Sequence, residues 1–283
     1  MKIGLVLEGG GMRGLYTAGV LDTFSRQQFL PDYIIGVSAG ACNGVSYVSG
    51  QQGRNYRINT DYLGDKRYIS LSNYLRTRSL FGMDFIFGEV PETLDPFDYS
   101  AFLAAPCAFI TGVTDVQTGK PVYFPKQPDM KSQCRLLRAS SSIPLFSPMV
   151  NLQGRSYLDG GTSDPIPVRQ ALADGCDRVI VVLTRHRGYQ KPPTSHRPVY
   201  RHAFRYYPAM VRLLDHRHQV YNDTLAYLKL LERSGKAMVI APSEPLTISR
   251  FEKHKEALDP IYALGQQNAR DLWERLAAWI GKT

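Results

Sequence analysis

The chain has 283 residues, of which 43% are hydrophobic, and its 34 Lys and Arg against 25 Asp and Glu give a net charge of +9. This length suits one large α/β domain or two small ones, and the hydrophobic share is enough for a sizeable core. No apolar run reaches the roughly 18 residues of a membrane-spanning helix. The apolar start, residues 2–7, is too short for a signal peptide and runs directly into Glu8 and glycines.

The positive charge is spread unevenly along the chain. Residues 185–218 contain seven Arg, one Lys and one Asp, so 8 − 1 = +7 of the net charge lies there. An ordinary solvated face is the first interpretation of this basic stretch. Peripheral contact with an anionic membrane surface is the second. Nucleic-acid binding comes last, although aromatic residues interleave with the arginines as stacking residues do.

The cysteines show no metal-ligand spacing. The four are scattered along the chain: Cys42, Cys107, Cys134 and Cys176. We expect small buried hydrophobic side chains in a reducing compartment, with no metal site and no cofactor. The expected location is therefore cytoplasmic, with a peripheral position at the inner face of the membrane as a further option.

The first elements in chain order are a buried strand over residues 2–8, a glycine loop over 9–14 and a helix over 15–24. The helix is indicated by apolar residues that recur at helical spacing. Successive glycine N–H groups at a helix N-terminus can hold a developing negative charge, so the loop is a candidate oxyanion hole.

The sequence of the same loop also fits a second kind of site, a dinucleotide-binding site. Gly9, Gly11 and Gly14 satisfy the G-x-G-x-x-G pattern of a dinucleotide-binding Rossmann fold. That fold needs an acid near the end of the second strand to hold the ribose. Here Ser38 stands at that end, and Asp32 lies at the opposite end of the strand. The pattern is therefore a weaker match to a nucleotide site than to an oxyanion loop.

The second strand is expected over residues 33–37 and runs into the pentapeptide Gly36-Val37-Ser38-Ala39-Gly40. A small-residue helix is expected over 41–48. Strand, sharp turn and helix form the context of a nucleophile elbow, in which a strained serine is exposed at the strand end. Gly and Ser are common in this chain, so the pentapeptide alone is unspecific. Its flanking elements make Ser38 a candidate nucleophile.

The middle of the chain is harder to interpret. Residues 53–105 show no clean period, and the apolar segment 80–88 fits either core packing or the wall or flap of an acyl-chain pocket. A strand over 108–113 with a hairpin partner at 121–124 follows.

The remaining elements alternate strands, turns and helices. Asp159 closes a short strand on a glycine turn, which is also the commonest use of an Asp-Gly pair. The other expected elements are a helix end running into a proline turn over 136–146, a helix over 168–173, a strand over 178–184, mostly helix over 203–233, a strand over 237–242 and a closing helix over 259–280 with Asp259 as N-cap and Pro260 at its first position.

Four motifs in order carry a family resemblance. They are Gly9-Gly10-Gly11-Met12-Arg13-Gly14, Gly36-Val37-Ser38-Ala39-Gly40, Ala139-Ser140-Ser141-Ser142-Ile143-Pro144 and Asp159-Gly160-Gly161. Over residues 1–185 the chain resembles the patatin-like phospholipases. The resemblance implies an α/β fold of three α/β/α layers with a mainly parallel central sheet, and a Ser–Asp dyad that hydrolyses acyl esters of lipids. Residues 186–283 lie outside it and are expected to form a basic, helical C-terminal extension packed on the catalytic core.

The resemblance also implies the roles of single residues. Ser38 matches the nucleophile and Asp159 the base. The oxyanion loop matches Gly9, Gly10 and Gly11 together with Arg13, whose other interpretation is a surface charge at a helix start. Glu8 departs from the Asp that the family usually carries before these glycines, and this change does not touch the dyad.

The histidines independently favour a dyad over a triad. In α/β hydrolases with a triad the chain order is Ser, acid, His. All six histidines follow Val182, and only His254 lies near an expected late strand end. We therefore expect a phospholipase, lysophospholipase or esterase without a catalytic histidine. The alternatives are a nucleotide-binding Rossmann-like protein and a catalytically silent lipid-binding module, against which an intact Ser38 and Asp159 argue.

Overall fold

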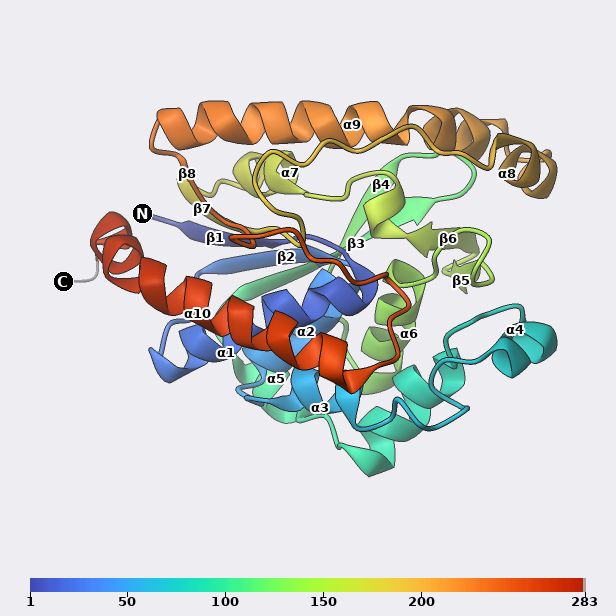
Figure 1. Ribbon diagram of the computed structural model, residues 1–283, viewed down its shortest axis with the longest axis horizontal. Coiled ribbons are helices and arrows are strands. Elements are labelled where there is room, and N and C mark those ends of the chain that lie inside the picture. The colour runs from blue at the N-terminus through green and yellow to red at the C-terminus, as the bar shows by residue number, and fades with distance from the viewer. Residues whose placement is uncertain (282–283) are drawn as a thin grey trace.

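The computed structural model describes residues 1–281 and shows three layers, with helices on both faces of one central sheet (Figure 1). The eight strands of the described chain are β1 (Ile3–Leu7), β2 (Tyr33–Val37), β3 (Ala108–Asp115), β4 (Pro121–Pro125), β5 (Val150–Leu152), β6 (Arg155–Asp159), β7 (Arg178–Val182) and β8 (Ala237–Ile240). Their order is β5-β6-β3-β2-β1-β7-β8, with β4 paired to β3. The five central strands from β3 to β8 run parallel, so the predicted mainly parallel sheet is confirmed.

The central strands are buried on both faces, which is why their sequences are nearly continuous apolar runs. One face is covered by α1 (Gly14–Arg26), α2 (Ala39–Val48) and α10 (Lys255–Ile280). The other face is covered by α7 (Val168–Ala173) and α9 (Pro208–Arg233). The apolar residues of these helices recur at helical spacing and pack against the sheet.

Shorter elements surround this sandwich. Residues 53–105, for which the sequence showed no clean period, form four helical segments with long connections. The shorter elements are η1 (Gly11–Arg13), α3 (Arg54–Thr60), α4 (Leu71–Thr77), a π-helix η2 (Phe85–Leu94), α5 (Tyr99–Ala104), α6 (Met130–Ser140), η3 (Gly160–Thr162) and α8 (Arg197–Ala203). The π-helix contains Pro91, whose missing N–H disturbs a regular helical ladder and hides the helical period.

One helix prediction is wrong in its start, and another is confirmed. The closing helix α10 begins at Lys255, with His254 as N-cap, and Pro260 lies inside it. A proline this close to a helix start removes only one hydrogen bond. The helical turn before Pro260 is stabilised because Leu258 is buried. The mostly helical pattern predicted over 203–233 is confirmed by α9, which begins with Pro208 at its first position, and the short helix α8 precedes it.

The C-terminal elements complete the same sheet and core. Strand β8 pairs in parallel with β7, and α10 crosses α1 (Figure 1). The crossing is close because it is made at glycines: a Cβ on Gly19 would lie 2.1 Å from the carbonyl oxygen of Tyr262, and one on Gly265 would lie 2.1 Å from that of Tyr16. The division between a core and an extension at residue 185 stays a prediction.

The strand register brings two strand ends together. Strand β2 ends with Val37 opposite Gly112 of β3, and β6 ends with Asp159 opposite Val113, the next residue of β3. Because β4 pairs with the other edge of β3 over the same residues, β2 and β6 share one edge and meet end to end. The residues at this junction, Ser38 and Asp159, are therefore neighbours although 121 positions separate them.

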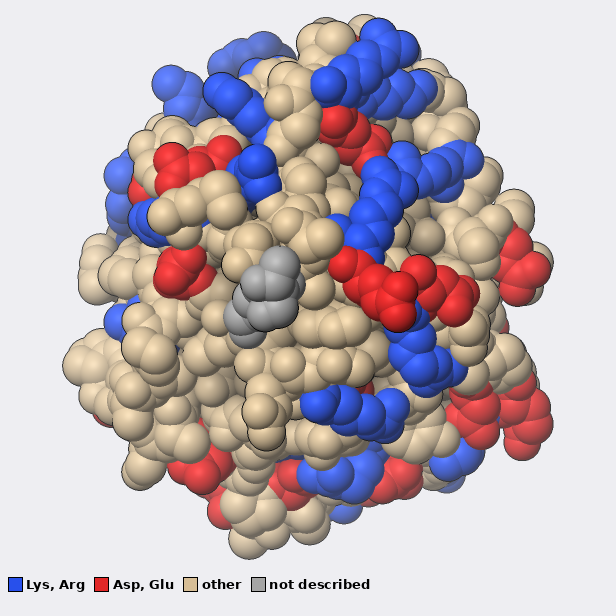
Figure 2. Space-filling model, turned by 90° about the vertical axis from the view of Figure 1, so that its left-hand side faces the viewer, with Lys and Arg blue, Asp and Glu red and all other residues tan. Residues whose placement is uncertain are grey.

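The surface view shows the side that carries the amino ends of the parallel strands, away from this junction (Figure 2). Lys and Arg are interspersed there with Asp and Glu and form no single basic patch. Within residues 1–281, no helix combines the length and the hydropathy of a membrane span. All four cysteines are free, and Cys107, Cys134 and Cys176 are buried as predicted, whereas Cys42 is half-buried.

Candidate active site

Ser38 lies at the sharp turn between β2 and α2. Its backbone is strained, with φ of 54° and ψ of −130°, which costs a non-glycine residue on the order of 1–3 kcal/mol. The conformation is held from the next strand, because the Ser38 N–H donates to Ser140 Oγ at 2.9 Å and Ser140 Oγ donates to the Gly112 carbonyl at 2.7 Å. This is the geometry expected of a nucleophile elbow.

Asp159 is only 6% exposed and is fixed from several sides. Its N–H donates to the Ser142 carbonyl at 2.8 Å, and its Oδ1 accepts the Gly161 N–H at 2.8 Å. The turn after it is possible only with glycine, since a Cβ on Gly160 would lie 2.2 Å from the Gly112 carbonyl oxygen. The carboxylate is thus held rigidly at the junction of β2 and β6.

Burial raises the pKa of the Asp159 carboxyl above its ordinary value. The Ser38 hydroxyl opposes this rise, as do the positive charge of Arg217 and the Gly161 N–H. The candidate nucleophile therefore lies near the candidate base. A carboxylate with a raised pKa is also a stronger base, which suits a proton acceptor.

The glycine loop lies against the same serine. A Cβ on Gly9 would be 3.0 Å from Ser38 Cβ, so the loop passes directly over the nucleophile. The loop is anchored through Thr184 Oγ1, which donates to the Gly9 carbonyl at 3.2 Å, and through the Met12 N–H, which donates to the Arg250 carbonyl at 3.2 Å. Within residues 1–281, the N–H groups of Gly9 and Gly10 donate no hydrogen bond and are free for a ligand.

Arg13 is not a surface charge, because it is only 8% exposed. Its buried Nε has no partner in the described chain. Burial, together with the positive charges of Arg185 and Arg250, lowers the pKa of Arg13 to about 10. The nearby carboxylate of Glu8 forms hydrogen bonds with other groups. It accepts the Thr184 N–H at 2.5 Å and the Tyr221 hydroxyl at 2.8 Å. Arg13 therefore lies inside the site, and among residues 1–281 it has no ion-pair partner.

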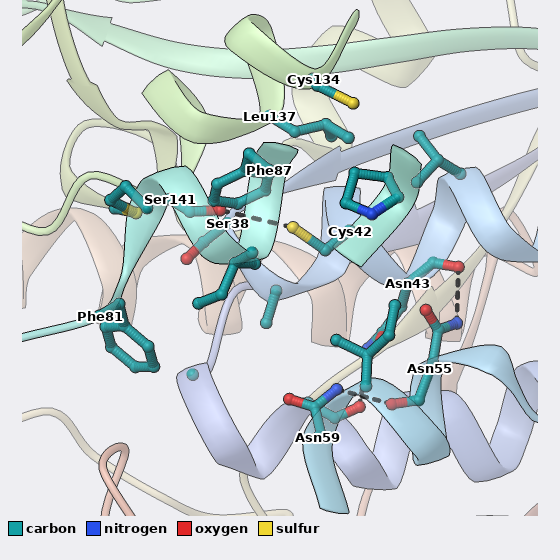
Figure 3. Close-up of a pocket in the computed structure, with 18 of the residues that line it drawn as sticks. Ser38, Cys42, Asn43, Asn55, Asn59, Phe81, Phe87, Cys134, Leu137 and Ser141 are labelled. Atoms are coloured by element: carbon teal, nitrogen blue, oxygen red, sulfur yellow. Dashed lines mark hydrogen bonds between the residues drawn. The ribbon is translucent and has the colours of Figure 1, made fainter. Parts of the chain in front are cut away.

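An apolar pocket opens on one side of Ser38 (Figure 3). It encloses about 990 Å³, counting the solvent at its mouth. Its walls come from α2, α3, α6 and the segment around the π-helix, and include Cys42, Ile58, Phe81, Met83, Ile86, Phe87, Pro91, Cys134 and Leu137. Such walls suit an alkyl chain.

Residues of the segment 80–88 divide between the core and the wall of this pocket. Phe85 packs into the core, whereas Phe81, Ile86 and Phe87 line the pocket. Polar residues of α3 at the same pocket were not singled out from the sequence. Asn55 Nδ2 donates to the Asn43 carbonyl at 3.0 Å, which ties α3 to α2 (Figure 3). No local pattern could reveal this contribution, since it depends on how α3 packs.

A second, cationic pocket also borders Ser38 and encloses about 580 Å³ with its mouth. Gly11, Ser38 and Ile143 line both pockets, so the serine stands where they meet. The cationic pocket also contains Asp159, Glu8, Gly9 and Gly10. The structure thus brings all the site residues predicted from the sequence, Ser38, Asp159, Gly9, Gly10, Gly11 and Arg13, to one place. Their catalytic roles stay predictions.

The family of the chain follows from comparison with known proteins. A family model described as patatin-like phospholipase matches residues 5–172, more than half of the chain. The chain belongs to this family. The predicted resemblance and the class of lipid ester hydrolase are therefore confirmed for this patatin-like phospholipase. A second model, a domain of unknown function (DUF6363), matches residues 207–281.

Individual relatives agree with the family. An uncharacterized protein, YjjU of Escherichia coli strain K12, is 29% identical over 272 residues, which is 94% of this chain and 75% of that protein. Lysophospholipase NTE1 of Saccharomyces cerevisiae is 29% identical over 191 residues, and that of Scheffersomyces stipitis 27% over 190. These matches cover 64% of this chain but only 10% and 11% of the two yeast proteins.

A solved structure confirms the fold of this patatin-like phospholipase. The crystal structure of VipD from Legionella pneumophila aligns with a TM-score of 0.54 at 12% identity. The alignment covers 97% of this chain and 67% of VipD. At this identity the similarity concerns the fold alone.

No histidine lies among the residues that line either pocket within the described chain. His254, the one candidate from the sequence, is the N-cap of α10 and hydrogen-bonds Glu252 at 2.7 Å. We therefore expect each of the six His→Ala variants to keep most of its turnover of a short-chain aryl ester. A loss of about 1,000-fold in any folded variant would be the signature of a general base and would support a triad instead.

Proposed function

We propose that this patatin-like phospholipase is a serine acyl hydrolase that uses a Ser38–Asp159 dyad to cleave acyl esters of lipids. The proposal rests on one observation above the others. Strands β2 and β6 meet end to end, which places a strained serine beside a buried carboxylate at the mouth of an apolar pocket. The family supports the lipid substrate, and the yeast relatives named lysophospholipase support esters with a single acyl chain.

The reaction begins with attack of Ser38 Oγ on the ester carbonyl carbon while Asp159 accepts the hydroxyl proton. The carbonyl oxygen becomes an oxyanion that the free N–H groups of Gly9 and Gly10 can stabilise, each donor contributing about 3 kcal/mol. Collapse of the tetrahedral intermediate breaks the bond to the alcohol, which leaves with the proton from Asp159. Water then repeats the sequence on the acyl-enzyme and releases the fatty acid.

The two pockets orient the substrate. The alkyl chain is buried in the apolar pocket, where each methylene removed from water contributes about 0.8 kcal/mol. The alcohol then points into the cationic pocket, because Ser38 lines both pockets. The dyad needs no metal ion in this sequence of steps.

Labelling with a fluorophosphonate tests the nucleophile. The reagent phosphonylates activated serines, and we expect one modified residue, Ser38, when the labelled protein is digested and mapped by mass spectrometry. Labelling at another serine would assign the nucleophile elsewhere. A folded protein that takes up no label would be the result expected of a silent lipid-binding module.

Peripheral contact with anionic membranes remains part of the proposal. Several cations of the basic stretch are paired: Arg187 bonds Glu232 at 2.8 Å, and Arg201 bonds Asp215 at 2.9 Å. Other residues of the basic stretch are exposed where α8 and α9 meet. They include Arg205 and Arg212, together with Tyr206, which is 75% exposed. This corner is the part of the stretch that can reach a lipid surface.

Sedimentation with vesicles of phosphatidylglycerol measures this contact. Each Arg near an anionic surface contributes about 1 kcal/mol, so the double variant Arg205→Ala, Arg212→Ala should bind about 30-fold more weakly. Binding should also weaken with salt, because the Debye length falls from ~10 Å at 0.1 M to ~3 Å at 1 M. Arg233→Ala, at the other end of α9, is the control. Equal binding in all variants and salts would reduce the stretch to a solvated face.

A further inference from the structure

The cationic pocket beside Ser38 contains five basic side chains: Arg13, Arg185, Lys191, Arg217 and Arg250. They come from distant parts of the chain. Arg13 lies in η1, Arg185 and Lys191 follow β7, Arg217 lies in α9, and Arg250 precedes α10. The fold therefore gathers these charges at the carboxyl end of the sheet.

The five cations lack acidic partners. None of them forms an ion pair within residues 1–281. The pocket contains two carboxylates, of which Glu8 already accepts hydrogen bonds from Thr184 and Tyr221, and Asp159 accepts the Gly161 N–H. The Nε atoms of Arg13 and Arg217 are buried and have no hydrogen-bond partner in the described part of the chain. Donors are thus left for a ligand.

The cations are held in place by uncharged groups. Lys191 is fixed through its backbone, whose N–H donates to Asn222 Oδ1 at 2.8 Å, and its ammonium lies 5.1 Å from the ring centre of Tyr221. The Arg185 guanidinium lies 4.6 Å from the ring centre of Tyr189. Arg217 donates to the Gly161 carbonyl at 3.0 Å. These contacts fix the positions of the cations within the pocket.

Holding like charges together in a half-buried pocket costs free energy. The cost is visible at Lys191, where burial and the charges of Arg217 and Arg250 lower the pKa to about 7. Costs of this kind concentrate at functional sites, where a ligand of opposite charge offsets them. Phosphate suits such a site best, because guanidinium groups bind its oxygens in pairs through charge-assisted hydrogen bonds.

We infer that the cationic pocket binds the phosphate of the substrate's leaving group, so that the enzyme selects lysophospholipids whose headgroup is net negative. This inference rests on the proposed function. The alkyl chain lies in the apolar pocket and the glycerol phosphate in the cationic pocket. Four of the five cations follow residue 172, where the patatin match ends, and Arg217 and Arg250 belong to the domain of unknown function. That domain thereby gains a role, which is to complete the headgroup site.

Binding is tested first without catalysis. Calorimetry on the Ser38→Ala protein measures the affinities for sn-glycerol 3-phosphate and for inorganic phosphate. Each of the variants Lys191→Gln and Arg250→Gln should weaken glycerol phosphate binding at least about fivefold, in keeping with the loss of one charge-assisted contact. Arg233→Gln removes the same charge from the exposed end of α9 and should change it less than about twofold.

Folding of the variants is checked by thermal unfolding. Loss of one cation from a like-charge cluster should leave the melting temperature of the free protein equal or higher. Phosphate at saturating concentration should then stabilise the parent protein more than either variant. A residue with only a structural role would show the reverse, with a lower melting temperature and the same phosphate effect.

Selection is tested on lipids with one acyl chain. The measured quantity is the ratio of kcat/KM for lysophosphatidylglycerol to that for lysophosphatidylcholine with the same chain. We expect a ratio above 1 that falls about tenfold or more in the double variant Lys191→Gln, Arg250→Gln and stays constant in Arg233→Gln. A ratio that is the same in the parent and the double variant would overturn the inference.

The outcomes separate the sources of the phosphate. If inorganic phosphate binds through Lys191 and Arg250 while the lipid ratio does not respond, the pocket is a free-phosphate site and the headgroup assignment is wrong. If glycerol phosphate does not bind at all, the inference is also wrong, although Ser38 can still take up fluorophosphonate. If Ser38 takes up no label while glycerol phosphate binds through both residues, the proposed hydrolysis fails and the phosphate pocket stands.

Discussion

Replacing Ser38 by alanine is expected to lower kcat/KM for an aryl ester by roughly 10⁵-fold, because removal of the attacking oxygen leaves only the binding and oxyanion contributions. The variant should fold. Its N–H can still donate to Ser140 Oγ, and alanine meets the positive φ of 54° at a cost similar to that of serine. Kinetics with p-nitrophenyl esters and a thermal melt measure the two effects.

Ser72→Ala is the matched control. Ser72 lies exposed on α4, outside both pockets, and the same hydroxyl deletion there should leave turnover within about twofold. Full activity in a folded Ser38→Ala protein, with the control behaving normally, would show that the strained turn is only a feature of the fold.

Replacing Asp159 by asparagine is expected to lower kcat by about 10³-fold, the range that a positioned general base supplies. The amide keeps the shape and can still accept the Gly161 N–H through its oxygen. It removes a buried charge, so stability should be equal or higher. Labelling of Ser38 by fluorophosphonate should slow in parallel, because the hydroxyl loses its proton acceptor.

The acid limb of the pH profile gives a second measurement. The base must be ionised, so activity falls as pH drops through the pKa of Asp159. Burial raises that pKa above the ordinary value of 3.8, so half-maximal activity should lie at a pH above 3.8. The positive charge of Arg217 lowers the pKa of Asp159. The variant Arg217→Gln removes that charge, so the pH at which activity is half-maximal should rise.

Asp164→Asn is the control for the dyad. The Asp164 carboxyl also has a pKa raised by burial, but it is bonded to the Tyr123 hydroxyl at 2.6 Å and does not line either pocket. This variant should keep most of its turnover. A folded Asp159→Asn protein with near-normal turnover would assign the base to another residue and leave Asp159 as a turn former.

Much of the fold could be predicted because the central elements are strongly patterned. The apolar runs at residues 2–8, 33–37 and 178–184 became the buried strands β1, β2 and β7. The errors lie where tertiary packing outweighs local signals. The start of α10 before Pro260 is an example, because burial of Leu258 against the core extends the helix beyond its strongest sequence signal.

The site was predictable to the extent that it is made of short motifs. Ser38, Asp159 and the glycine loop each carry a recognisable spacing. The walls of the apolar pocket and the gathering of Arg185, Lys191 and Arg250 are contacts between distant segments, which no window of sequence contains. Net charge indicated a basic stretch, but it could not distinguish cations that enter the site from those that pair with Asp215 or Glu232.

The meeting of β2 and β6 end to end has a consequence for protein synthesis. A nascent chain that has emerged only to β2 already contains Ser38, but Asp159 joins it after β6 has paired with β3. The central strand β1 can pair with β7 only after β7 has been synthesised, and Glu8 can accept the Tyr221 hydroxyl only after α9 has been synthesised. Such long-range pairings form late, since the intervening chain must first be ordered. If Ser38 and Asp159 act as proposed, the site is complete only after most of the chain has left the ribosome.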